Sequence, residues 1–146
     1  MKATDLDKQL VAPCGINCAY CIGYLIKKTG KMIKGKYKGC IGCRSRNKQC
    51  AFLKGRCELL RENKIDFCYQ CENFPCDNLK KLEARYKKKN WDTSFIENNE
   101  RIKSIGLEKF ILEQRKRFTC SKCKGAICIH TSSCFNCGHS FIENLK

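Results

Sequence analysis

The chain of 146 residues carries 30 Lys and Arg residues against 14 Asp and Glu residues, and this excess favours anionic partners, namely nucleic acid or an acidic protein surface. No apolar run approaches the ~20 residues that a membrane span needs, and no apolar core of a secretory signal is present, which predicts a cytoplasmic protein without a membrane partner. The odd number of cysteines, 15, predicts reduced thiolates on metal rather than a disulfide framework.

We expect a small, metal-stabilised α+β protein built from three segments. A cysteine-rich zinc-knuckle module spans residues 1–77, a helical segment spans residues 78–117, and a β-hairpin zinc ribbon spans residues 118–146. Apart from the cysteines, the supply of core-forming residues is modest, so metal binding is expected to contribute to the free energy of folding.

The first predicted elements are short helices at residues 19–28 and 51–63. Asp77 is expected to cap a helix that runs from residue 78 to about residue 89, because apolar residues recur there at steps of three and four. The spacing of Ser94 and Glu97 is that of a capping box, which predicts a helix that ends at Ile105.

Gly106 is expected to end that helix as a left-handed cap. The next helix spans residues 107–117 and ends in basic residues, which are favourable at the negative end of the helix dipole. Residues 126–130 alternate as a strand does, and residues 140–142 are expected to close a hairpin with it.

The most specific pattern in the chain is a pair of CxxC units in its last segment. Its members are Cys120, Cys123, Cys134 and Cys137. This spacing predicts a four-thiolate zinc site, which is structural because four thiolates fill a tetrahedron. We expect His130 to lie beside this site rather than to bind the metal, and Cys128 to pack on one face of the strand.

The other cysteines are predicted to hold further zinc ions, about three in the whole chain. A second site is predicted at Cys40, Cys43, Cys50 and Cys57. For a third site, the two remaining CxxC pairs are preferred, Cys18, Cys21, Cys68 and Cys71. Cys14 and Cys76 are further candidate ligands, and exchange of ligands between the two groups stays open.

Two short motifs have known counterparts. The spacing of Cys14, Cys18 and Cys21 looks like the cluster loop of radical S-adenosylmethionine enzymes, although the chain lacks the length and the βα pattern of their barrel. An iron–sulfur cluster is therefore an alternative cofactor. The segment from Cys40 to Cys50 looks like half of a fungal binuclear zinc cluster, whose basic residues face DNA phosphates. That likeness makes Arg44, Arg46 and Lys48 candidate phosphate contacts.

A whole string of motifs resembles one family more closely. These motifs are Cys14-Gly15-x2-Cys18-x2-Cys21, Cys40-x-Gly42-Cys43 and Phe67-Cys68-Tyr69-x-Cys71-x2-Phe74-Pro75-Cys76. They are similar to a prokaryotic cysteine-rich domain-of-unknown-function family, number three-seven-nine-five. The tail, which contains the predicted zinc ribbon, looks like that of longer members. The resemblance implies a zinc-binding cytosolic protein and supplies no catalytic residues.

No constellation of catalytic residues is evident, and no motif identifies a small-molecule substrate. We therefore expect a multi-zinc adaptor rather than an enzyme, with nucleic acid as its partner. One alternative is an iron–sulfur or redox-active protein. Another is a sensor of thiol or metal stress, which would use the thiols left over after three sites.

Overall fold

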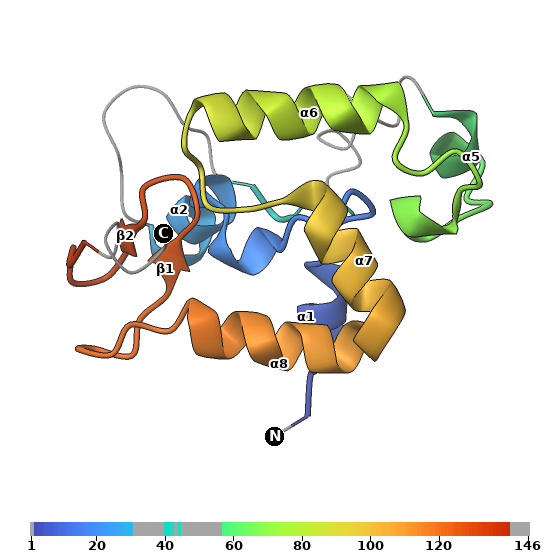
Figure 1. The fold of residues 1–146 in the computed structure, drawn as a ribbon. Helices are drawn as coiled ribbons and strands as arrows, with labels where there is room; N and C mark the ends of the chain where they lie inside the picture. The colour runs from blue at the N-terminus through green and yellow to red at the C-terminus, as the bar shows by residue number, and fades with distance from the viewer. Residues whose placement is uncertain (1, 31–39, 43, 45–56, 141–146) are drawn as a thin grey trace.

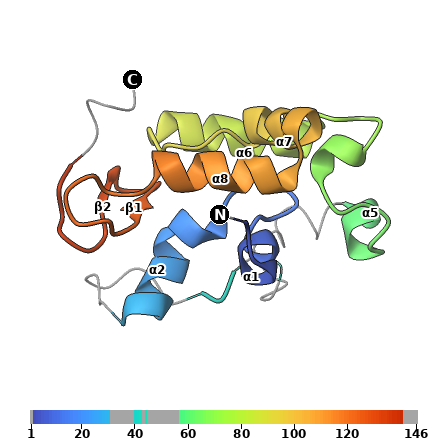
Figure 2. The ribbon, with the colours of Figure 1, turned by 90° about the horizontal axis from the view of Figure 1, so that it is seen from below.

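The computed structural model describes residues 2–30, 40–42, 44 and 57–140. It confirms an α+β fold, in which helices form two layers and an antiparallel hairpin lies at one end (Figures 1 and 2). One layer contains α6 (Asp77–Lys88), α7 (Phe95–Ile105) and α8 (Leu107–Arg117). The other contains α1 (Asp5–Gln9) and α2 (Ile22–Thr29). The short helix α5 (Glu58–Arg61) lies at the end opposite the hairpin (Figure 2).

The ends of α7 and α8 agree with the predicted ends, because local chemistry sets them. Ser94 caps α7, and its hydroxyl accepts the backbone N–H of Glu97 at 3.1 Å. Gly106 follows α7 with a φ of +90° and a ψ of 158°, so it turns the chain with positive φ but outside the left-handed helical region that we predicted. α8 then begins at Leu107 and ends at Arg117.

Two predicted helix starts are corrected. The helix expected from residue 19 is divided, because Cys18–Tyr20 forms a separate 3-10 turn and Cys21 is extended, with a φ of −81° and a ψ of 138°. α2 therefore begins only at Ile22. Asp77 is the first residue of α6 rather than its cap, and no side chain caps this helix. Of the helix predicted at 51–63, residues 51–56 lie outside the described residues.

The hairpin is shorter than the predicted one and has a different second strand. β1 (Ile127–Cys128) pairs with β2 (Ser133–Cys134), with Ile127 opposite Cys134. Ser140 makes only an isolated bridge to Ser133, and residues 141 and 142 lie outside the described residues. The chain reverses near Ser132, whose φ is +53°, so β2 follows β1 after only a few residues.

Residues from all three predicted segments share one hydrophobic cluster, which includes Leu10, Leu79 and Ile127. Phe118, just before the hairpin, is fully buried, and its ring stacks on Tyr20 with 4.9 Å between centroids. The three segments therefore meet in a common core, while the boundaries between them stay a prediction. No helix among the described residues combines the length and the apolar character that crossing a membrane requires.

Candidate metal centre

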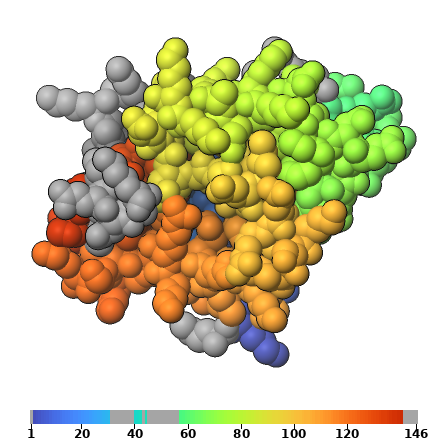
Figure 3. All heavy atoms as spheres, in the orientation of Figure 1, coloured from blue at the N-terminus to red at the C-terminus, as the bar shows by residue number. Residues whose placement is uncertain are grey.

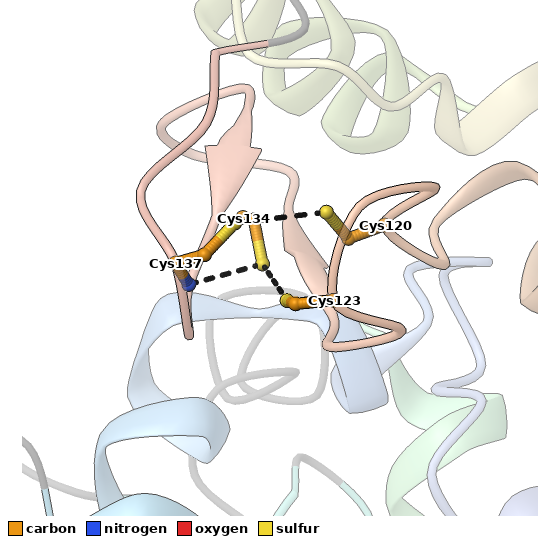
Figure 4. A group of neighbouring side chains, drawn as sticks. All are labelled: Cys120, Cys123, Cys134 and Cys137. Carbon is orange, nitrogen blue, oxygen red and sulfur yellow. Dashed lines mark hydrogen bonds between the residues drawn. The ribbon is translucent and has the colours of Figure 1, made fainter.

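The four cysteines of the predicted ribbon lie in two turns that face each other across the hairpin (Figure 4). Cys120 and Cys123 belong to the turn after α8, and Cys134 and Cys137 belong to the turn that begins in β2. Backbone hydrogen bonds fix the first turn, because the N–H of Cys120 donates to Gly125 and that of Lys124 donates to Cys120, at 2.8 and 2.9 Å. The structure thus brings together four thiols that are up to 17 residues apart.

The distances between the sulfur atoms are those that one metal ion requires. All four Sγ atoms lie within 4.8 Å of one another. The Sγ atoms of Cys123 and Cys134 are 3.4 Å apart, and those of Cys120 and Cys137 are 3.7 Å apart. A tetrahedral zinc ion with Zn–S bonds of about 2.3 Å separates its sulfur ligands by about 3.8 Å. The cluster therefore has the size of a four-thiolate zinc site.

Hydrogen-bond donors already face the sulfur atoms. Four N–H donors each lie 3.4 Å from a sulfur, and they belong to Lys122, Gly125, Asn136 and Cys137. Such bonds spread the negative charge of a thiolate and so favour the form that binds metal. The Asn136 side chain, which donates to Cys123, was not foreseen from the sequence, although its place between Cys134 and Cys137 could have indicated it.

The pKa values of the cluster show how four neighbouring thiols oppose full ionisation. The amide of Asn136 and the N–H of Gly125 lower the pKa of Cys123 to about 6. For Cys137, the N–H of His139 acts to lower the pKa, but desolvation and the neighbouring thiols outweigh it and raise the pKa to about 11. At pH 7 the thiol of Cys123 ionises readily, whereas the thiol of Cys137 stays protonated. A bound cation is therefore needed before all four become thiolates at this pH.

Gly125 is the residue that the packing of this centre most clearly requires. A Cβ at Gly125 would lie 2.8 Å from Cβ of Asn136 and 3.2 Å from the Sγ atoms of both Cys123 and Cys134. Any side chain there would therefore displace Asn136 and crowd the two sulfur atoms.

Both ring nitrogens of His130 have partners outside the group of four cysteines. Its Nδ1 accepts the backbone N–H of Ile22 at 3.3 Å, which leaves the ring proton on Nε2, 3.2 Å from the hydroxyl oxygen of Tyr86. Burial lowers the pKa of His130 from 6.5 to about 4. The imidazole is therefore neutral at pH 7 and connects α2 to α6.

Lowering the pH is expected to destabilise the fold through His130. The unfolded chain takes up a proton below pH 6.5, whereas the folded chain does so only near pH 4. This stability is present above pH 6.5 and is lost as the pH falls toward 4, by about 3 kcal/mol at most. Urea denaturation from pH 7.5 to 4.5 should therefore show a shallower fall for His130→Gln than for the native chain.

Acid also releases metal from thiolates, so the relevant quantity is the difference between the two proteins at each pH. That difference should shrink steadily as the pH falls. Parallel stability curves for the native chain and His130→Gln would contradict the buried, neutral histidine.

The other predicted metal ligands are not gathered in this way. Among the described residues, only the ribbon cysteines form a group of three or more thiols, imidazoles or carboxylates within 4.8 Å. Cys43 and Cys50, half of the predicted second site, lie outside the described residues. Eight further predicted ligands are described and are buried or half-buried, Cys14, Cys18, Cys21, Cys40, Cys57, Cys68, Cys71 and Cys76. Their grouping on metal ions stays a prediction.

Of the candidate phosphate contacts, only Arg44 lies within the described residues. Its Nε donates to the carbonyl of Val11 at 2.7 Å, and its second guanidinium nitrogen donates to that of Asp66 at 2.8 Å. The guanidinium also lies 4.8 Å above the ring of Phe67. Arg44 therefore connects the segment that contains Val11 to the segment that contains Asp66. Arg46 and Lys48 lie outside the described residues.

Comparison with known proteins gave one match. Residues 10–81 match the model of a family described as Protein of unknown function (DUF3795), which is the family that the cysteine motifs had indicated. No match was found among curated proteins or among solved structures.

Proposed function

We propose that this chain, which belongs to the DUF3795 family through residues 10–81, is a zinc-stabilised adaptor that binds nucleic acid and catalyses no reaction. The observation that carries the proposal is a group of four thiols of the size of a zinc site, in a chain whose helix α6 is strongly basic. The thiols account for how the ribbon is held in place, and the basic helix supplies the surface for a partner.

Zinc suits the ribbon better than the alternatives. Thiolates select soft ions, which include zinc and the iron of iron–sulfur clusters. Two CxxC turns joined by a short hairpin are typical of a structural zinc site, in which four thiolates leave no position open for a substrate. In this proposal the metal is structural. Iron in the purified protein would favour the iron–sulfur alternative instead.

The ribbon that the metal would hold connects the chain before α2 to the chain after α6. The backbone N–H of Ile129 donates to the carbonyl of Tyr20 at 3.0 Å, and the carbonyl of Ile129 accepts the N–H of Asp92 at 2.9 Å. Cys128 and Phe135 pack against α2 in a separate apolar cluster. Binding of metal to the turns on either side would therefore fix the contact of α2 with the chain that follows α6.

α6 carries more exposed cations than any other described helix, and Figure 3 shows side chains of this helix, in yellow-green, at the surface. Six exposed cations occupy this helix and the residue after it, Lys80, Lys81, Arg85, Lys87, Lys88 and Lys89. The helix has one exposed acid, Asp77, because its other carboxylate, Glu83, is buried and accepts the N–H of Phe95 at 2.7 Å. A helix with this imbalance suits a phosphodiester backbone.

An aromatic ring lies at the end of this basic face. The ammonium group of Lys89 is 4.9 Å from the centroid of the Trp91 ring. Basic side chains next to aromatic rings are what single-stranded nucleic acids bind, through phosphate contacts and base stacking. This arrangement favours nucleic acid over an acidic protein surface as the partner.

The double variant Lys81→Glu/Lys88→Glu is expected to weaken binding of short single-stranded RNA or DNA by at least about tenfold. The two residues are seven apart and so lie on one face of α6. Loss of two phosphate contacts should also lower the slope of log affinity against log salt by about two. Fluorescence anisotropy of a labelled oligonucleotide, measured over a range of salt concentrations, gives both quantities.

A matched control is Lys103→Glu/Lys109→Glu, which changes two exposed lysines on α7 and α8 and alters the net charge equally. It should retain most of the affinity. Equal losses in the two variants would show that only net charge matters, and absence of salt-dependent binding by the metal-loaded native chain would refute the nucleic-acid partner.

A further inference from the structure

A hollow lies where the end of α8 meets the first cysteine turn of the ribbon, at the hairpin end of the molecule (Figure 1). It has a volume of about 480 Å³ and is open to solvent on one side. Three cations and two hydroxyl groups line it beside the first ribbon cysteine, and these residues are Arg115, Lys116, Lys124, Thr119, Ser121 and Cys120. No carboxylate is among the described residues that line it, so its charge suits an anion.

The cations of this hollow differ in how far they are already paired. Arg115 donates to the carboxylate of Asp7 at 2.8 Å, which neutralises part of its charge. Lys116 and Lys124 are exposed, and neither forms an ion pair with a carboxylate among the described residues. A zinc ion with four thiolates has a net charge of about −2, so part of this positive charge balances the metal centre. The remainder attracts an anion from solution.

The two cysteine turns of the ribbon, which face each other in Figure 4, share a backbone hydrogen bond. The N–H of Lys124 donates to the carbonyl of Cys120, and the N–H of Gly138 donates to the carbonyl of Cys134, both at 2.9 Å. Lys124 and Gly138 therefore occupy equivalent positions in the two turns. Both positions have a positive φ, +66° at Lys124 and +80° at Gly138.

Lysine is a disfavoured residue at such a position. A positive φ costs glycine little, whereas it brings the Cβ of any other residue close to its own backbone. The second turn has the glycine that this conformation favours, but the first turn has a lysine that lines the hollow. A residue held in a disfavoured conformation points to a role for its side chain.

From these observations we infer that the hollow binds a phosphate group, with Lys116 and Lys124 as its charged contacts. Lysine binds phosphate as a point charge, and the hydroxyl of Ser121 can donate a hydrogen bond to a phosphate oxygen. The open side leaves room for the rest of a larger molecule, such as a nucleotide or a nucleic-acid strand. No described residue of α6 lines the hollow, so this site is additional to the basic helix and does not depend on the partner proposed for it.

The substitution Lys124→Gly separates binding from folding. Glycine suits a φ of +66°, so the variant should retain its metal and unfold at a urea concentration no lower than the native chain does. Its affinity for inorganic phosphate should fall about tenfold, which is the effect of losing one hydrogen bond to a charged group. The shift of the Ser121 backbone amide, followed by NMR of the metal-loaded full chain at constant ionic strength, gives this affinity.

The matched control is Lys122→Gln, which removes an equal charge from the same turn. Lys122 is exposed and is not among the residues that line the hollow. Its substitution should change the affinity for phosphate by less than about twofold. Equal losses in the two variants would show that the lysines only balance the charge of the metal centre, and would overturn the inference. Amide shifts of equal size with acetate would overturn it as well.

A titration of the same protein with short single-stranded RNA identifies the carrier of the phosphate. Shifts at Ser121 that weaken in Lys124→Gly would support the hollow and assign its phosphate to nucleic acid. Shifts with inorganic phosphate but none with RNA would support the hollow and count against the nucleic-acid partner. RNA shifts confined to α6, with no response of the hollow to either probe, would overturn the inference and leave that partner in place.

Discussion

Replacing Cys123 by serine is expected to release one metal ion and to unfold the ribbon from Phe118 to Ser140. A structural zinc site contributes binding free energy on the order of 10 kcal/mol to folding, and loss of one thiolate removes much of it. The loss of affinity should exceed the 10- to 100-fold that follows loss of a residue supporting a metal ligand. Backbone amides of Ile127, Ile129 and Cys134 should then exchange with solvent far faster than in the native chain.

The matched control for this experiment is Cys128→Ala. Cys128 is fully buried in the same hairpin and packs against α2, so its removal tests packing without touching the four gathered sulfurs. We expect it to retain the metal and the slow exchange of the ribbon. If Cys123→Ser keeps both its metal and its slow amide exchange, the four-thiolate centre is wrong.

The second large effect is expected at Asn99, a fully buried side chain on α7. Its amide nitrogen donates to the carbonyl of Cys14 at 2.8 Å, and its oxygen accepts the N–H of Tyr69 at 3.0 Å. One side chain therefore satisfies a backbone carbonyl in the segment before the Cys18 turn and a backbone N–H within the 3-10 turn Cys68–Gln70. Replacement by leucine leaves these two groups buried without this partner, and each such group costs about 1–3 kcal/mol.

We therefore expect Asn99→Leu to lower the free energy of unfolding by about 3–5 kcal/mol, measured by urea denaturation of metal-loaded protein. Glu100→Ala, at the next and exposed position of the same helix, should change it by less than about 0.5 kcal/mol. Similar small effects for both variants would show that α7 does not hold the two turns in place.

The elements that were predicted well are those whose limits depend on neighbouring residues. Ser94 and Gly106 fixed the ends of α7, because a cap and a positive-φ glycine act within one helical turn. The hairpin was predicted with the wrong second strand, because its strands have two residues each and follow from turns around the cysteines rather than from alternation. The helix predicted from residue 19 overlooked the separate turn at Cys18.

The candidate site shows the same division between local and distant contacts. The CxxC spacing predicted which four thiols the ribbon brings together, because each pair is local and a short hairpin connects them. Arg44 looked like a phosphate contact by its neighbours in the sequence, but it binds carbonyls of Val11 and Asp66. The predicted pairing of the Cys18 turn with the Cys68 turn stays a prediction, and backbone hydrogen bonds attach the two turns to Leu10 and Pro13 of one short segment.

Metal analysis of the native chain decides whether a zinc ion joins the four ribbon cysteines. The protein is purified without added metal, and its metal is identified by elemental analysis and counted by native mass spectrometry beside Cys123→Ser. We predict a colourless protein that contains zinc and a variant that contains one zinc ion fewer. Iron with visible charge-transfer absorption, or equal metal content in the two proteins, would contradict the claim.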